Sequence, residues 1–166
     1  TLAKMLKPEV EIVGVEPCGA ACMKLSFEQD EVCSLQSVST IADGVAVMKP
    51  GDKVFPYIQA HVDRILSIED EELIDAFLNV MEIHKLVVEN AGLLSVAALS
   101  HLGLTGKNVV SILSGGNMDV ITIASMVQHG LIYRGRVFTF SVLLPDRPGE
   151  LEKISHIVAH LAGNII

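Results

Sequence analysis

The sequence has no tryptophan, few clustered basic residues and no long uncharged apolar run. Its 166 residues carry a formal net charge of −8. An acidic chain without basic patches is poorly suited to bind nucleic acid or an anionic membrane surface. Charged residues interrupt each apolar stretch before it reaches the length of a bilayer span. We therefore expect neither nucleic acid nor a membrane as a partner.

Cysteine is scarce as well, and Cys18, Cys22 and Cys33 are odd in number. Such a set, in a sequence without a secretory signature, indicates reduced thiols and therefore a cytoplasmic protein. A zinc site needs a fourth ligand and closer pairing than these cysteines offer. We therefore predict no metal at the cysteines.

What the chain does contain is apolar sequence, at 50% of its residues, in alternating strand and helix patterns. Strand patterns lie near residues 10–15, 64–68, 109–113 and 137–144, and another begins at 163. Helix patterns lie near residues 1–6, 19–28, 55–61, 70–86 (with a capping box at 67–70), 90–102, 117–130 and 150–161. A loop is expected over residues 34–50. The alternation predicts an α/β fold in which helices cover a parallel sheet.

The stretch 108–130, NVVSILSGGNMDVITIASMVQHG, predicts where a ligand site forms. A strand pattern leads through Ser-Gly-Gly-Asn into a helix pattern, the order in which parallel-sheet proteins place ligands at strand ends. Gly115 and Gly116 permit a sharp turn and a close approach to a ligand. Asn117 is expected as the N-cap, and Gly130 as the residue that follows the helix. Taken alone, the pattern also fits an ordinary turn between a strand and a helix.

Several segments together resemble one protein family. VEIVGVEP, TIADGVAV, KLVVENAG and VVSILSGGN, in that order, are similar to the later part of the catalytic domain of threonine ammonia-lyases, which use pyridoxal 5'-phosphate. The resemblance implies the fold type II architecture of the tryptophan synthase β-subunit. FTFSVLLPDRPGELEKISHIVAHLAGNII resembles the first half of an ACT domain, a ferredoxin-like βαβ module that senses small molecules. Two domains are implied, a partial catalytic domain at 1–133 and a partial ACT domain at 134–166.

The resemblance also shows which parts of the family's machinery have no match here. No lysine of the chain matches the Schiff-base motif, and no segment matches the tetraglycine loop that holds the cofactor phosphate. In the family both lie upstream of the matching segments. We therefore predict a partial chain that supplies no catalytic lysine and has no lyase activity alone.

In this family the serine of the glycine turn, here Ser114, hydrogen-bonds the pyridine nitrogen of the cofactor. Gly115, Gly116 and Asn117 are expected to shape the loop around it. A neutral hydroxyl leaves the nitrogen largely unprotonated, whereas a carboxylate would hold a pyridinium and make the ring a stronger electron sink. The alternative for Ser114 is a helix-start serine that satisfies backbone groups.

Other matching positions imply further contacts with the cofactor. Glu89 matches an acidic residue near the cofactor ring, and Gly44 matches a segment that passes the cofactor with its backbone. The alternative for Glu89 is a solvated loop residue. Glu16 matches an acidic residue of a divalent-cation site in some relatives. Because Cys22 stands where that site has a further carboxylate, too few oxygen ligands remain, and no metal is predicted.

The ACT-like segment implies an effector site at Asp146, Gly149 and Leu151. The turn before a helix exposes N–H groups there, which in complete ACT domains bind an amino-acid carboxylate. A helix N-terminus without a ligand is the alternative.

The resemblance implies the β-elimination of L-threonine to 2-oxobutanoate and ammonia, a regulated step toward branched-chain amino acids such as isoleucine. A serine dehydratase or serine racemase of the same fold, acting on L-serine, is the alternative enzyme. A non-catalytic sensing module joined to an ACT segment is the alternative from another class. Exposed sheet edges and apolar helix faces predict association, as a homo-oligomer.

Overall fold

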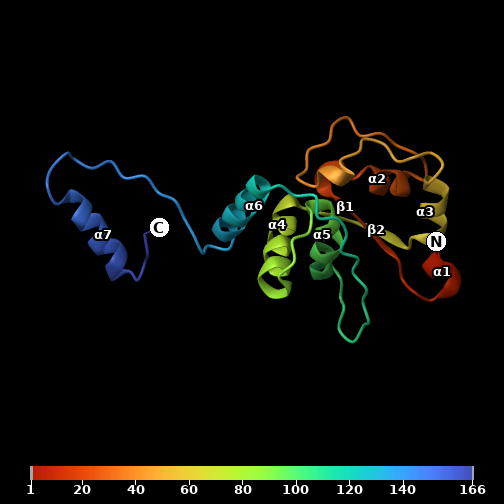
Figure 1. The fold of residues 1–166 in the computed structure, drawn as a ribbon. Helices are drawn as coiled ribbons and strands as arrows, with labels where there is room; N and C mark the ends of the chain where they lie inside the picture. Colours follow the sequence, from red (N-terminus) through yellow and green to blue (C-terminus); the bar gives the residue numbers. More distant parts are fainter. Residues whose placement is uncertain (1, 166) are drawn as a thin grey trace.

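The centre of the fold is a short parallel sheet, seen in the computed structural model of the chain, which describes residues 2–165 (Figure 1). Strands β1 (Val13–Pro17) and β2 (Arg64–Ile68) pair along their full length, with Val13 opposite Arg64 and Pro17 opposite Ile68. Parallel strands need a long crossover, and helices form within it. The predicted α/β class, with parallel strands and covering helices, is confirmed.

The connection from β1 to β2 contains two short 3₁₀ turns and two helices, which are η1 (Cys18–Ala20), α2 (Cys22–Gln29), η2 (Asp43–Val45) and α3 (Phe55–His61). The helix predicted at 19–28 therefore starts later, and the loop predicted at 34–50 contains only η2. Before β1, helix α1 (Leu2–Leu6) is tied to the start of β2 by an ion pair of 2.8 Å between Lys4 and Asp63.

Helix α4 (Asp70–Asn79) begins directly after β2. Its N-cap is Glu69, whose N–H donates to the Glu72 carboxylate at 3.0 Å in a reciprocal capping box. The predicted box was placed too early, because Ser67 still belongs to β2. The predicted helix to residue 86 is also too long. A π-helical turn, η3 (Val80–His84), follows α4 and ends at Lys85 with a left-handed φ of 59°.

The core lies where α4 packs against α5 (Asn90–Ala97), the 3₁₀ turn η4 (Ala98–His101), β2 and α6 (Val120–Tyr133). Its largest buried apolar side chains are Ile68, Leu73, Phe77, Leu78 and Leu93. Burial of each such side chain contributes about 1.5–3 kcal/mol relative to exposure. The core therefore fixes the starts of α4 and α5 relative to the end of β2.

Helix α6 (Val120–Tyr133) begins and ends later than the helix predicted over residues 117–130. Its N-cap is Asp119 and not Asn117, because the Asp119 Oδ1 accepts the backbone N–H three residues later at 2.8 Å. The helix runs through Gly130, where a β-carbon would lie 2.5 Å from the Cδ1 of Leu78. Gly130 therefore permits close packing of α6 on α4 instead of ending the helix.

The predicted strand at 109–113 does not join the sheet, in which β1 and β2 pair only with each other within residues 2–165. Ser95 of α5 donates its hydroxyl to the carbonyl of Ile112 at 2.8 Å, and Ser111 donates to Ser95 at 3.0 Å. These side-chain bonds to a helix hold the segment in place of a strand ladder.

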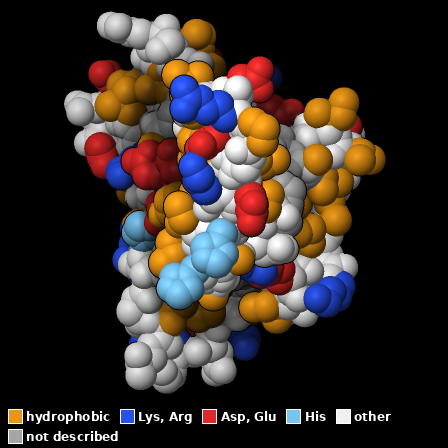
Figure 2. Space-filling model, turned by 90° about the vertical axis from the view of Figure 1, so that its left-hand side faces the viewer, with side chains coloured by type: hydrophobic (Ala, Val, Ile, Leu, Met, Phe, Trp, Pro, Cys, Tyr) orange, Lys and Arg blue, Asp and Glu red, His pale blue; other side chains and the backbone are white. Residues whose placement is uncertain are grey.

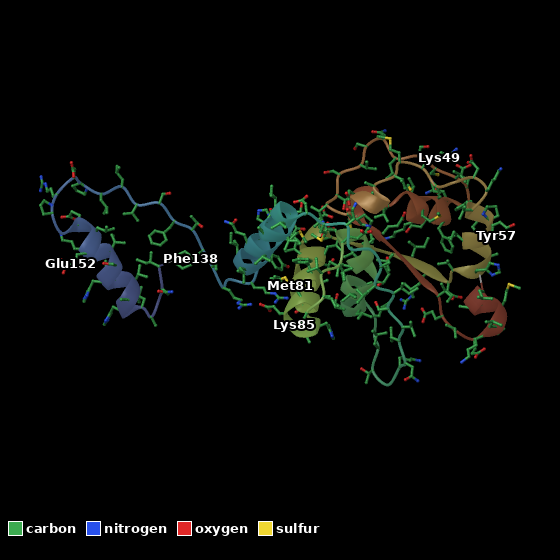
Figure 3. The ribbon with its side chains drawn as sticks, viewed as in Figure 1. Lys49, Tyr57, Met81, Lys85, Phe138 and Glu152 are labelled. Carbon is green, nitrogen blue, oxygen red and sulfur yellow. The ribbon has the colours of Figure 1, made fainter. Side chains whose placement is uncertain are left out.

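The C-terminal segment contains helix α7 (Glu150–His160), close to the predicted helix, but none of its residues is buried. Figure 1 shows α7 beyond α6 and away from the sheet, and Figure 3 shows Phe138 and Glu152 apart from Met81 and Lys85. The segments 137–144 and 163–165 form no strand, because no partner strand lies beside them. Thr1 and Ile166, which fall in the first predicted helix and last predicted strand, lie outside the described residues.

The surface at the α7 end carries apolar side chains between charged and histidine side chains (Figure 2). Leu151 and Leu161 of this region are 72% and 76% exposed. The start of the segment is joined to α4 and η3 by three ion pairs, Arg134 with Asp75 at 2.7 Å, Arg134 with Glu82 at 3.2 Å, and Arg136 with Glu82. Within residues 2–165, no helix has both the length and the apolar character needed to cross a membrane.

Candidate functional site

The segment 40–44 is anchored just beyond the carboxyl end of β2. Thr40 donates its hydroxyl to the Oδ1 of Asp70 at 2.6 Å, and Ile41 donates its N–H to the Oδ2 of Asp70 at 2.9 Å. From the opposite side, the Nδ2 of Asn90 donates to the carbonyl oxygen of Ile41 at 2.9 Å. Asp70 and Asn90, the first residues of α4 and α5, therefore hold the backbone N–H and the backbone C=O of the same loop residue, Ile41.

Gly44, the last residue of the anchored segment, lies against the start of α5. A β-carbon added to Gly44 would be 3.2 Å from the Cβ of Ala91 and 3.8 Å from the Oε1 of Glu89. Gly44 is exposed, so its backbone is accessible at the point where it approaches the Glu89 carboxylate.

The half-buried Glu89 also contacts the glycine turn that the sequence singled out. Its N–H donates to the carbonyl of Gly115 at 3.3 Å, and its Oε2 accepts the N–H of Asn117 at 3.1 Å. Gly115 has a left-handed φ of 75°, and a β-carbon there would overlap the Glu89 carboxylate. Both the backbone conformation and the close approach require glycine at this position.

Ser114 is positioned by the absence of a side chain on α5. A β-carbon on Gly92 would overlap the carbonyl group of Ser114, so the glycine lets the turn lie directly on the helix. Ser114 is exposed, and its neighbour Gly115 contacts Glu89. An exposed serine therefore stands one residue from the glycine that contacts the Glu89 carboxylate.

The structure thus brings together all of the predicted cofactor-contact residues, which are Gly44, Glu89, Ser114, Gly115, Gly116 and Asn117. The group offers one hydroxyl, one carboxylate and backbone that is free of side chains at three glycines. A flat heteroaromatic ligand could lie against such glycines while its edge meets the two polar side chains.

Glu16 has a structural contact instead of a ligand position. Its carboxylate accepts the N–H groups of Met23 and Lys24 at 3.0 and 2.8 Å, at the start of α2. Burial raises the pKa of Glu16, against the lowering effect of these two hydrogen bonds. Within residues 2–165, no cluster of three or more histidine, cysteine, aspartate or glutamate side chains is arranged to hold a metal ion.

Cys18 is a thiol with little tendency to ionise. Burial, followed by its hydrogen bond to Glu69, raises the pKa of Cys18 to about 11. Because the thiolate is the reactive form, this cysteine is a weak nucleophile at neutral pH.

The predicted effector residues lie elsewhere, at the start of α7. Gly149 is the N-cap with a left-handed φ of 85°, and Leu151 is exposed in the first turn. Asp146 lies in the exposed turn just before. The structure does not bring these residues to the Glu89 contact.

Three residues of the site were not singled out by sequence reasoning, namely Asp70, Asn90 and Gly92. Asp70 follows directly after a parallel strand, where such folds place their ligands, so its position was a usable signal. Asn90 and Gly92 lie in the ENAG segment beside Glu89, but their partners are distant in the sequence and could not be read from it.

Comparisons with known proteins relate the chain to pyridoxal-phosphate dependent enzymes. Residues 1–115 match the family model described as pyridoxal-phosphate dependent enzyme. The chain is 37% identical to an L-threonine ammonia-lyase of Thermotoga maritima over 164 residues, an alignment that covers 98% of this chain. The processed form of threonine deaminase isoform 2 from Solanum lycopersicum is similar in structure, with a TM-score of 0.71 and 29% identity over 78% of this chain and 37% of that one. Maize serine racemase has a TM-score of 0.67 and 31% identity, over 76% and 42% of the respective chains.

The chain belongs to the family of pyridoxal-phosphate dependent enzymes, since the family model covers more than half of it. This confirms the family and the cofactor that the motifs predicted. The chain spans only 41% of the length of the Thermotoga maritima relative.

Proposed function

We propose that this chain forms the carboxyl-terminal part of the catalytic domain of a pyridoxal-phosphate-dependent threonine ammonia-lyase. The reaction converts L-threonine to 2-oxobutanoate and ammonia. The observation that carries the proposal is the convergence of Gly44, Glu89 and the turn 114–117, three segments that are far apart in the sequence. Similarity to an L-threonine ammonia-lyase supports the choice of reaction.

The residues present fit the ring end of the cofactor. Bound pyridoxal phosphate supplies an electron sink for negative charge at the substrate α-carbon. Ser114 would hold the ring nitrogen through a neutral hydroxyl, and the glycine backbone at 44 and 115 leaves room for a flat ring. Glu89, fixed by the Asn117 N–H, would place a carboxylate at the ring's edge.

The neutral partner at the ring nitrogen favours elimination over reactions that need a long-lived carbanion. A carboxylate at this position would hold a proton on the nitrogen and spread the negative charge further into the ring. A hydroxyl from Ser114 would instead leave the pyridine nitrogen without that proton, a setting that would favour loss of the β-hydroxyl group of threonine. Ser114 therefore directs the outcome of the reaction without itself carrying a proton to the substrate.

The experiment uses the natural gene product that contains this chain, and measures 2-oxobutanoate formed from L-threonine with added pyridoxal phosphate. Ser114→Asp should lower kcat by about tenfold or more, or about 1.4 kcal/mol in activation free energy. Ser114→Thr keeps the hydroxyl and is the matched control, expected to retain most activity. Residues 1–166 alone should give no 2-oxobutanoate. Unchanged kinetics in Ser114→Asp, or turnover by the isolated chain, would contradict the proposal.

The similarity to maize serine racemase makes L-serine the second candidate substrate. The same enzyme preparation, given L-serine, should form less 2-oxoacid than with L-threonine and no D-serine. A higher kcat/KM for L-serine would favour the serine dehydratase, and D-serine formation the racemase.

We further propose that residues 134–166 begin an ACT module whose turn at Asp146, Gly149 and Leu151 binds an amino-acid effector. The left-handed Gly149 and the amphipathic α7 support this. In the natural protein, isoleucine or valine should change threonine turnover, and Asp146→Ala should weaken that response. The exposed apolar residues Val110 and Ile112 support a homo-oligomer, which sedimentation can test.

A further inference from the structure

The loop 34–50 contains a single short 3₁₀ turn, yet it must present Gly44 at a defined place beside Glu89. Its early part is held by two backbone hydrogen bonds, from Ser39 to Gly19 at 3.0 Å and from Leu35 to Met48 at 2.8 Å. A loop of this length has many accessible conformations, and fixing one of them is entropically costly. The remaining anchors therefore determine where its tip lies.

These anchors are two polar side chains that begin helices. Asp70 uses both carboxylate oxygens, one for the Thr40 hydroxyl and one for the Ile41 N–H. The Ala42 N–H then donates to the Thr40 Oγ1 at 3.1 Å, which extends the network by one residue. Ala42 itself is fully buried, so the network continues directly into the core.

Asn90 holds the other side of the same loop. Asn90 is buried, with 7% of the residue exposed, and its Nδ2 donates to the Ile41 carbonyl. Its Oδ1 is buried without a hydrogen-bond partner within the described residues. If the amide were turned over, its Oδ1 would face the Ile41 carbonyl oxygen, and the two oxygens would repel each other. The amide therefore keeps this orientation for the loop contact, although one oxygen stays unpaired.

We propose that Asp70 and Asn90 are positioning residues for the cofactor site, which act by clamping the backbone N–H and C=O of Ile41 and so setting Gly44 against Glu89. This rests on the proposed function, because the loop matters for catalysis only if the cofactor ring lies at Gly44. Neither side chain is proposed to touch the cofactor or the substrate.

The test uses the natural gene product freed of pyridoxal phosphate, with isosteric variants. Asp70→Asn removes one acceptor, and Asn90→Asp replaces the donor that faces the Ile41 carbonyl. Glu71→Gln removes a charge from the same helix turn, where the side chain is exposed, and is the matched control. Hydrogen exchange of residues 40–46 and titration with pyridoxal phosphate, followed by absorbance, are measured for each.

We expect Asp70→Asn and Asn90→Asp to speed exchange of residues 40–46 and to weaken pyridoxal phosphate binding by about five- to tenfold, since each removes a partly buried hydrogen bond. Glu71→Gln should change neither. Wild-type binding constants in both variants would overturn the clamp while leaving the proposed function intact. Faster exchange with unchanged binding would overturn it equally. Failure of the wild-type protein to bind pyridoxal phosphate would overturn both.

A variant of Asp70 that fails to fold does not end the test, because Thr40 carries part of the same contact without belonging to a helix. Thr40→Val loses the hydroxyl and should reproduce the faster exchange and weaker binding, whereas Thr40→Ser keeps the hydroxyl and should restore both. Equal behaviour of Val and Ser at this position would contradict the proposal.

Discussion

Gly115 shows at the residue scale how an absent side chain shapes the candidate site. Its left-handed φ of 75° and its contact with the Glu89 carboxylate both exclude a β-carbon. Gly106 has a similar φ of 72° but open space around it. Comparing alanine substitutions at these two glycines therefore separates the cost of a left-handed backbone from the cost of overlap with Glu89.

We predict that Gly115→Ala destabilises the protein by about 3 kcal/mol or more, since strain and overlap add. Gly106→Ala should cost only about 1 kcal/mol, for the left-handed backbone alone. Urea unfolding of both variants checks this. Equal losses of unfolding free energy in the two variants would mean that the Glu89 contact adds nothing. Pyridoxal phosphate binding should weaken in Gly115→Ala and not in Gly106→Ala.

The same residues show what the sequence could and could not predict. The predicted cofactor-contact residues came from motifs that resemble the family in a fixed order, and glycines at a strand-to-helix turn have a local physical meaning; the structure brings these residues together. The anchor between Thr40 and Asp70 joins residues 30 positions apart, and no local pattern specifies it. The unpaired oxygen of Asn90 is likewise a property of packing and not of sequence.

At the scale of elements, Gly130 places α6 on α4. A glycine inside a helix normally costs about 1 kcal/mol relative to alanine. Here a β-carbon would press on Leu78, at 2.5 Å from its Cδ1 and 2.8 Å from its Cγ. At position 130, glycine should therefore be more stable than alanine.

We predict that Gly130→Ala destabilises the protein by about 1–3 kcal/mol, as overpacking does. In a Leu78→Ala background, itself about 2–5 kcal/mol less stable, the same substitution should become neutral or stabilising. Thermal unfolding of the two single variants and the double variant gives both values. A stabilising Gly130→Ala in the wild-type background would show that the helices do not meet at this point.

Element positions were predicted well where the signal was periodic and poorly where tertiary contacts set the ends. The strand at 64–68 and the helix at 55–61 were predicted with the bounds that the structure has. The start of α4 at Asp70 was predicted, but its N-cap is Glu69 and not Ser67, and a π-helical turn replaces its predicted last turns. The N-cap of α6 is Asp119 and not Asn117. The run at 109–113 has strand composition, but composition cannot provide a partner strand.

At the scale of the whole molecule, carboxyl groups with opposite pKa changes govern stability against pH. The N–H of Ile12 lowers the pKa of Asp63, the Arg136 side chain lowers that of Glu82, and the N–H of Thr122 lowers that of Asp119. Groups of this kind stabilise the fold above their unfolded pKa values of 3.8 or 4.5, and this is lost as the pH falls through the folded values. Burial raises the pKa of Glu16, so its contribution is greatest below 4.5 and is lost as the pH rises.

We therefore predict that the free energy of unfolding falls between pH 5 and pH 3, a window of about two pH units set by these carboxyl groups. Asp63→Asn should make the fall shallower, whereas Glu16→Gln should make it steeper, because it removes a group whose contribution to stability increases in acid. Urea unfolding at several pH values measures the slopes. A change of both slopes in the same direction would contradict the assigned pKa directions.

The most direct test concerns the contact between the Ser114 hydroxyl and the pyridine nitrogen of the cofactor. The natural gene product is loaded with pyridoxal phosphate that carries ¹⁵N in the ring, and the nitrogen resonance is recorded for wild type, Ser114→Thr and Ser114→Asp. We predict an unprotonated pyridine nitrogen in wild type and Ser114→Thr, and a pyridinium nitrogen in Ser114→Asp. A pyridinium signal in the wild-type protein, or a signal that Ser114→Asp leaves unchanged, would show that Ser114 does not face the ring nitrogen.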